Sequence, residues 1–119
     1  MDDLVVWLRA QLDEDERTAR AAKPGPWHAD GSVYATHPTD AVVDYSESAE
    51  HIAAWDPPRV LREIDAKRQL LDDFAPLLAQ TDATIDGEWN GHDDLHGRLL
   101  ACLALPYADR PGYRDEWRP

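Results

Sequence analysis

Two histidines, His92 and His96, stand four residues apart, a spacing that places both imidazoles on one side of a helix. Two ligands of a zinc ion require this geometry. Asp93 lies between them, where zinc proteases of similar pattern carry a glutamate. The run therefore supports the hypothesis of a metal-dependent hydrolase in which Asp93 is the general base. Asp93 is shorter than glutamate, however, and a third ligand would have to come from elsewhere in the chain.

A structural role for the same histidines is the favoured interpretation. In a helical projection, His92 and His96 line up with Leu99 and Leu103, which predicts half-buried imidazoles that bond to nearby carboxylates. Cys102 falls in the same apolar stripe, where a thiol is usually inert packing. The sequence has no Gly-x-Ser-x-Gly elbow and no glycine-rich loop. We therefore expect no catalytic residues and no cofactor, with zinc kept as the alternative.

The C-terminal residues 105–118 combine the three residue types that dominate protein-binding hot spots, which are Trp, Tyr and Arg. This composition predicts that Tyr107, Tyr113, Arg114 and Trp117 contact another protein. The alternative is that the segment docks back on its own domain. Five tryptophans are spread one to each segment of the chain, a distribution that favours tying the elements into one core. Some of them would face a partner if the segment is a recognition surface.

Charge restricts the class of partner. The 119 residues include 24 carboxylates against 12 Lys and Arg, a net charge of -12. This balance argues against direct binding of nucleic acid. Residues 24–58 and 69–97 contain no Lys or Arg at all. The favoured interpretation is a solvated acidic surface, and the second alternative is a nucleic-acid mimic that inhibits a DNA-binding protein.

Three features of the sequence predict the compartment: the length of its apolar runs, its single cysteine and its first residues. The longest apolar runs, such as 99–105, are far shorter than the roughly 20 residues of a membrane span. The single cysteine cannot form an internal disulfide, and the first residues have no signal-peptide pattern. We expect a cytoplasmic protein without membrane contact.

The first half of the chain predicts a helix followed by a small sheet. Asp2 or Asp3 caps a helix whose leucines recur at helical spacing until Pro24 ends it. Ion pairs at i, i+4 are expected within residues 13–20, from Asp13 to Arg17 and from Glu16 to Arg20. Alternating residues at 27–29, 32–36 and 41–45 then predict three antiparallel strands.

The second half predicts a short helical segment and two further helices. Residues 50–55 form one or two turns, after which Asp56 caps a long helix that has Pro57 in its first turn. That helix should cover the sheet, and Pro76 should end or kink it near Ala75. Residues 80–91 have no sustained period and are interpreted as a loop. A last helix runs from about Asp93 to Pro106.

These elements define one α+β domain over residues 1–119. It consists of an N-terminal helix, a three-stranded antiparallel meander, a long central helix packed on the sheet, and a C-terminal helix with an aromatic tail. The expected role is a non-enzymatic accessory or interaction protein whose partner is another protein.

Three stretches together resemble a family of small actinobacterial and actinophage proteins of unknown function, the domain-of-unknown-function family 6221 type. They are residues 7–16 (WLRAQLDEDE), residues 56–67 (DPPRVLREIDAK) and residues 105–117 (LPYADRPGYRDEW). The resemblance covers almost the whole chain in order. It implies no activity, because the family has no assigned reaction. The preference for Arg and Ala over Lys is typical of a high-GC genome.

Overall fold

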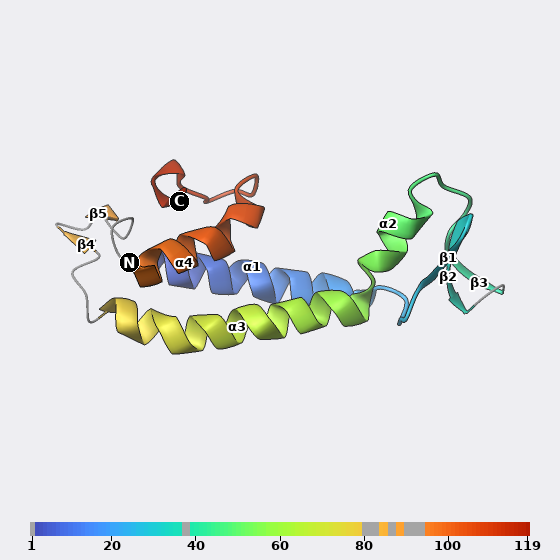
Figure 1. The fold of residues 1–119 in the computed structure, drawn as a ribbon, viewed down its shortest axis with the longest axis horizontal. Coiled ribbons are helices and arrows are strands. Elements are labelled where there is room, and N and C mark those ends of the chain that lie inside the picture. The colour runs from blue at the N-terminus through green and yellow to red at the C-terminus, as the bar shows by residue number, and fades with distance from the viewer. Residues whose placement is uncertain (1, 37–38, 80–83, 86–87, 90–94) are drawn as a thin grey trace. The chain divides into compact units, whose positions relative to one another are not determined.

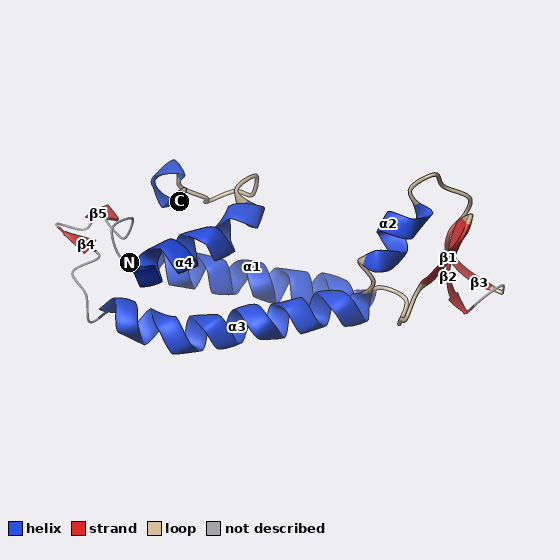
Figure 2. Ribbon diagram, viewed as in Figure 1, coloured by secondary structure: helices blue, strands red, loops and turns tan. Residues whose placement is uncertain are grey.

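A computed structural model of the protein describes residues 2–36, 39–79, 84–85, 88–89 and 95–119 (Figure 1). The fold is α+β, as the sequence predicts (Figure 2). In chain order the elements are α1 (Asp2–Ala21), β1 (His28–Asp30), β2 (Ser32–Thr36), β3 (Asp40–Val43), α2 (Ala49–Ala54), α3 (Pro57–Ala79), β4 (Thr84–Ile85), β5 (Glu88–Trp89), α4 (Leu95–Ala104) and the 3-10 turns η2 (Leu105–Tyr107) and η3 (Asp115–Trp117).

The chain divides into two compact units, and the division falls inside α1 and α3. Unit 1 consists of Met1–Asp13 with Ala66–Pro119, and unit 2 of Glu14–Asp65. Each unit has its own buried residues.

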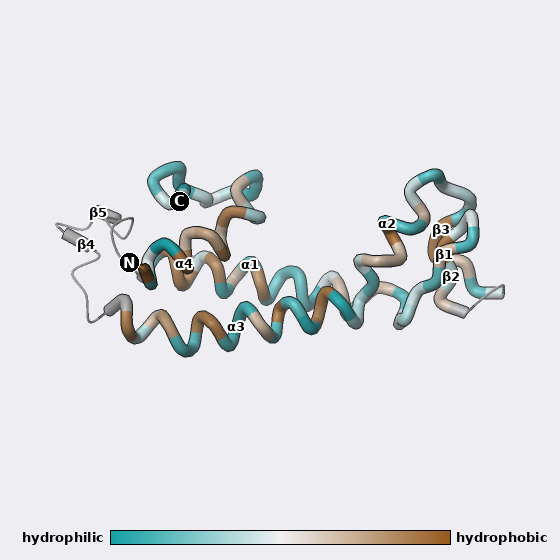
Figure 3. The backbone as a smooth tube through the Cα atoms, in the orientation of Figure 1, coloured by the Kyte–Doolittle hydropathy of each residue, from teal (hydrophilic) through white to brown (hydrophobic). Residues whose placement is uncertain are grey.

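The core of unit 1 is built on the leucine face of α1. Leu4, Leu8 and Leu12 are fully buried, as their helical spacing predicts. The later parts of the chain contribute the rest of this core, which consists of Leu71, Leu100, Ala101, Ala104, Tyr107 and Trp117. Figure 3 shows that much of α4 is hydrophobic. Arg9 and Arg68 cross from helix to helix within the unit, to Asp72 at 3.0 Å and Asp13 at 2.7 Å.

The predicted face of α4 is confirmed in part. His96, Leu99 and Leu103 are half-buried, as their alignment predicts, whereas the fully covered residues are Gly97, Leu100, Ala101 and Ala104. Cys102 is exposed, so the prediction that it packs in an apolar stripe is wrong. Three of the four buried residues have small side chains, which suits close packing of a helix, and the most buried face lies one position from the predicted one.

Unit 2 contains the predicted meander, in the order β1-β2-β3 with antiparallel pairing. The first turn is centred on Gly31, because Asp30 pairs with Ser32, and Gly31 has a φ of 71° that other residues rarely adopt. The helix that makes the principal contacts with β1 and β2 is α2. The expectation that the long central helix covers the sheet is therefore wrong, since the short helix before it takes that place.

The start of α3 is confirmed in detail. Asp56 Oδ1 accepts the backbone N–H of Arg59 at 3.1 Å, which is the expected capping bond. The other carboxylate oxygen, Oδ2, accepts the backbone N–H of Trp27 at 3.0 Å. Asp56 is only 8% exposed. One buried carboxylate therefore caps α3 and also holds the segment that leads into β1.

Two local features of the second half differ from the prediction. The helix α3 does not end near Ala75 but continues to Ala79 with Pro76 inside it, and a kink there stays a prediction. Proline there removes a single amide donor one turn before the helix end, so three further residues remain helical. The expected loop contains the short antiparallel pair β4 and β5, in which Thr84 faces Trp89 and Ile85 faces Glu88.

The double role of Asp56 predicts a large effect on stability. We expect Asp56→Ala to lower the free energy of unfolding by roughly 2–3 kcal/mol, because it removes a helix cap and leaves a part-buried N–H without its acceptor. Asp65→Ala is the matched control, since it removes an exposed carboxylate from the same helix, and it should change the value by less than about 0.5 kcal/mol. Urea unfolding followed by circular dichroism measures both. Equal effects would contradict the role assigned to Asp56.

Candidate functional site

Unit 2 has an open surface hollow of about 290 Å³ with a mostly apolar lining. Two indole rings, Trp27 and Trp55, contribute to its wall together with Pro57 and Val60. Asp15 and Thr18 are the polar residues of the lining. Concave apolar sites with a few placed polar groups are the usual form of a binding site.

The hollow exists because α1 changes character along its length. Its first half presents Leu4, Leu8 and Leu12, whereas the corresponding face further along carries Ala19, with Ala22 just beyond the helix end. Both alanines line the hollow. An alanine fills much less space than a leucine, so room remains beside the two tryptophans.

Trp27 is fixed at both its backbone and its ring. Its indole Nε1 donates to the carbonyl of Lys23 at 2.9 Å, and its backbone N–H donates to Asp56 as described above. The preceding turn packs tightly, because a Cβ on Gly25 would lie 2.6 Å from Pro58 Cδ. Only glycine fits there, so the position of Trp27 is set by close packing.

Trp55 is fixed by its neighbours and remains accessible. It directly follows α2, and its side chain is 45% exposed. The guanidinium of Arg59 lies 4.3 Å from the centre of the Trp55 ring, a cation–π contact. Arg59 is itself held by Glu63 at 3.2 Å. The ring therefore has limited freedom to rotate.

A second hollow of about 310 Å³ adjoins the first, and both share Ala19, Ala22 and Pro57 in their lining. The second adds Arg20, Pro24, Gly25, Pro58 and Leu61. We refer to the two hollows together as the Trp27–Trp55 groove. Its lining consists largely of rings and small side chains, which suits contact with an apolar ligand surface.

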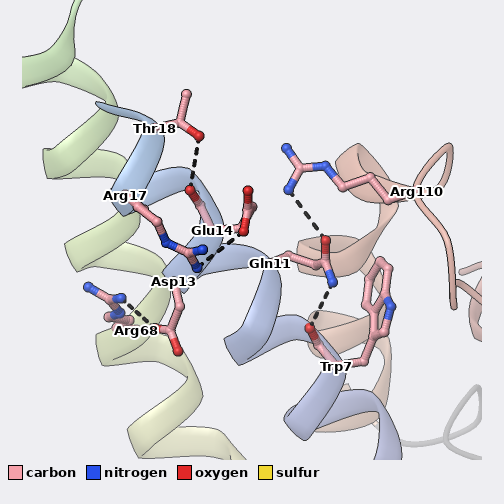
Figure 4. Close-up of polar contacts among 8 residues, drawn as sticks. All are labelled: Trp7, Gln11, Asp13, Glu14, Arg17, Thr18, Arg68 and Arg110. Carbon is pink, nitrogen blue, oxygen red and sulfur yellow. Dashed lines mark hydrogen bonds and ion pairs between the residues drawn. The ribbon is translucent and has the colours of Figure 1, made fainter. Parts of the chain in front are cut away.

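The unit that contains the groove is acidic, because residues 14–65 include 11 Asp and Glu against 5 Lys and Arg. Asp15 lines the first hollow and Arg20 lines the second. Arg17 pairs with Glu14 at 3.1 Å and Arg20 pairs with Glu16 at 3.4 Å. The expected pair of Asp13 with Arg17 is not formed, because Asp13 bonds to Arg68 instead (Figure 4). The guanidinium of Arg20, at the edge of the second hollow, is thus paired with a carboxylate.

The aromatic tail lies against α1 in unit 1. Tyr107 is 5% exposed and Trp117 is 2% exposed. Trp7 is at the centre, with ring centroids 5.6 Å from Tyr113 and 5.4 Å from Trp117, and its Nε1 donates to the Pro111 carbonyl at 3.0 Å. Docking on the chain itself, the alternative stated above, is the observed arrangement. Partner contact by the tail stays a prediction.

Polar contacts hold the tail as well. Arg110 donates to Gln11 Oε1 at 3.4 Å, and Gln11 donates in turn to the Trp7 carbonyl at 3.3 Å (Figure 4). Arg114 is half-exposed and pairs with Asp3 at 3.2 Å. Of the four residues predicted to contact a partner, Arg114 is the most accessible.

The two tyrosines of the tail differ in their polar contacts. The Tyr107 hydroxyl accepts a hydrogen bond from Lys67 Nζ at 3.0 Å. The Tyr113 hydroxyl is buried and has no partner among the residues that the structure describes. Burial raises the pKa of Tyr113 above its ordinary value, while nearby Arg118 lowers the pKa and Asp115 raises it, both to a smaller degree.

The predicted metal site lies partly outside the described residues, which include neither His92 nor Asp93. His96 is half-buried on α4, and its ring centroid is 5.5 Å from that of Phe74. Across the described part of the chain, no three His, Cys, Asp or Glu side chains gather as metal ligands. The packing of His96 agrees with the structural interpretation, and metal binding stays a prediction.

A family model described as a family of unknown function, DUF6221, matches residues 1–119. The chain belongs to the DUF6221 family. Comparison with curated proteins and with solved structures gave no match. The family assignment carries no reaction, so the function of this DUF6221 chain has to be argued from its own residues. None of its helices in the described ranges is long and apolar enough to cross a bilayer.

Sequence reasoning missed the groove of this DUF6221 protein. Trp27 and Trp55 are 28 positions apart in the numbering, and no motif links them. The sequence pattern that bears on the groove is the presence of alanine at positions 19 and 22, where the earlier turns of the helix carry leucine, beside two segments rich in proline. That pattern indicates a poorly filled helix face, but it does not reveal which aromatic rings border it.

Removing the hydroxyl of Tyr107 or of Tyr113 should affect stability to different degrees. We expect Tyr107→Phe to lower the free energy of unfolding by about 1 kcal/mol, because the bond from Lys67 is lost. Tyr113→Phe should change it by less than about 0.5 kcal/mol at neutral pH, since that hydroxyl has no described partner. Chemical denaturation of both variants checks the contrast.

The pH dependence of stability gives a second test of the buried Tyr113 hydroxyl. Above the ordinary Tyr pKa of 10.0, the unfolded state releases the Tyr113 proton while the folded state retains it. Because the folded state then binds more protons, stability falls as pH rises from about 10 towards the raised pKa. Tyr113→Phe should lack this part of the alkaline loss. An unchanged alkaline profile in that variant would contradict the burial of the phenol.

Proposed function

We propose that this protein is a non-enzymatic accessory protein that binds a segment of another protein in the Trp27–Trp55 groove. The observation that carries the proposal is the pair of fixed indole rings beside an open, mostly apolar hollow, with one ring 45% exposed. Rigid aromatic side chains in a concave surface are the typical anchors of protein recognition. Pre-fixed rings also lose little conformational entropy on binding.

The chemistry of the lining favours binding over bond-making. Asp15 and Thr18 are the polar side chains of the first hollow, and the Thr18 hydroxyl donates to the Glu14 carbonyl at 3.1 Å. A carboxylate and an engaged hydroxyl do not form a nucleophile–base pair. Such groups can orient a ligand, and the apolar walls can supply contact area.

The tail is the less favoured place for the partner. Tyr107 and Trp117 are buried in unit 1, so they would have to leave their packing before meeting another chain. The composition and the family resemblance support origin in an actinobacterium or its phage, and a cytoplasmic location, as part of the same proposal.

The experiment replaces one residue with a photocrosslinking amino acid in the cells that naturally make the chain. Benzoylphenylalanine in place of Trp55 should give one defined adduct with a protein, which mass spectrometry identifies. The matched control carries the probe in place of Tyr45, an aromatic residue of the same unit that is 77% exposed and does not line the groove. That probe should give no such adduct.

A blocking variant completes the design. Thr18→Arg adds a long side chain to the lining at an exposed helix position, where it should fold normally. It should reduce the Trp55-position adduct at least about tenfold, because the groove is filled. The proposal fails if positions 55 and 45 give the same adducts, or if blocking has no effect.

A further inference from the structure

We infer that the segment bound in the Trp27–Trp55 groove is an extended, proline-containing peptide with basic side chains. This inference rests on the proposed function and names the class of partner that fits the same site. Its basis is the combination of aromatic and proline lining, two adjoining hollows, and an acidic unit in which four of the five Lys and Arg are paired with carboxylates.

The lining favours a polyproline II segment over a helix or a strand. Such a segment has no internal hydrogen bonds and is already extended before binding, so it loses little entropy in docking on aromatic surfaces. An added strand would need a free sheet edge, whereas Trp55 follows α2 and Pro57 is the first residue of α3. A helix about 10–12 Å wide suits one broad trough rather than two small hollows.

A segment in that conformation can use both adjoining hollows. They adjoin at Ala19, Ala22 and Pro57, and each has a volume close to 300 Å³, at 290 and 310 Å³. A polyproline II helix has three residues per turn and rises about 3.1 Å per residue, so similar ridges recur roughly every 9 Å. Successive ridges of one peptide can therefore enter neighbouring hollows.

Charge decides between basic and acidic peptides. Within unit 2, Arg17, Arg20 and Arg59 each pair with a carboxylate, and Lys23 pairs with Asp40. The chain as a whole has a net charge of -12. Within residues 14–65 there are 11 Asp and Glu against 5 Lys and Arg. At the groove itself, Asp15 adds a carboxylate to the first hollow, and Arg20 in the lining of the second is paired with Glu16. A basic peptide is attracted to this surface, whereas an acidic one is repelled.

The contact of Arg59 with Trp55 shows which group the exposed indole accepts. A guanidinium already lies 4.3 Å from the ring centre. An arginine of the peptide can make the same kind of contact with accessible parts of the indoles. Arginine beside proline is therefore the expected composition of the bound segment.

The experiment measures fluorescence anisotropy of three labelled peptides of about twelve residues, titrated with the full chain. The first repeats Arg-Pro-Pro, the second Arg-Gly-Ser and the third Glu-Pro-Pro. The second keeps the charge without proline, and the third keeps proline with the opposite charge. We expect Arg-Pro-Pro to bind at least about tenfold tighter than either control. At higher salt its advantage over Glu-Pro-Pro should shrink, while its advantage over Arg-Gly-Ser persists.

Two exposed aromatic residues supply the matched variants. Trp55→Ala should weaken binding of the Arg-Pro-Pro peptide at least about tenfold, whereas Tyr45→Ala should leave it within about twofold. Equal binding of Arg-Pro-Pro and Arg-Gly-Ser would overturn the inference, as would equal effects of the two substitutions. Self-association through the groove, seen as oligomers in light scattering that Trp55→Ala removes, would overturn it as well.

The two tests fail separately. A specific adduct at position 55 without preference for Arg-Pro-Pro leaves the proposed function intact and removes the peptide class. Preference for Arg-Pro-Pro without a specific adduct supports the inferred class of peptide and removes the proposed cellular role.

Discussion

The carboxylate of Asp56 is the constraint on which the arrangement of unit 2 depends. One oxygen caps α3 through Arg59, and the other holds the backbone of Trp27. Its neighbours on either side, Trp55 and Pro57, both line the first hollow. A single buried side chain thus sets the direction of a helix and the position of one indole, and it lies between two further wall residues. The side chain that caps α3 therefore also determines the geometry of the site.

A second constraint is the scarcity of positive charge. The chain has 12 Lys and Arg, and most of those in the described ranges contact a carboxylate or an aromatic ring within the same unit. In unit 1 the rings of Tyr107, Tyr113 and Trp117 each have a cation near one face. Basic residues therefore serve internal cohesion, and the surface left for other molecules is anionic in character.

Periodicity was sufficient to predict the four helices and the three-stranded meander, because spacing decides whether a stripe or an alternation forms. It did not predict the two-residue strands β4 and β5, which are too short to show an alternation. It was insufficient for α4 as well, where the buried residues lie one position from the predicted stripe. It also misassigned the cover of the sheet, since both α2 and α3 offered apolar residues. The groove was beyond prediction because Asp56 and Trp27 meet across 29 positions without a local pattern.

The arrangement of the two units in the sequence has a consequence for synthesis. Unit 2 is one continuous stretch, Glu14–Asp65, whereas unit 1 joins Met1–Asp13 to Ala66–Pro119. Trp7 therefore meets Pro111 across 104 positions, and its packing with Trp117 spans more still. At roughly 5–20 residues per second, the ribosome needs several seconds to make the intervening residues after unit 2 is complete. During that interval the leucine face of the first helix is not yet covered by the later residues of unit 1. This exposed apolar face is a segment of the nascent chain that needs protection from aggregation.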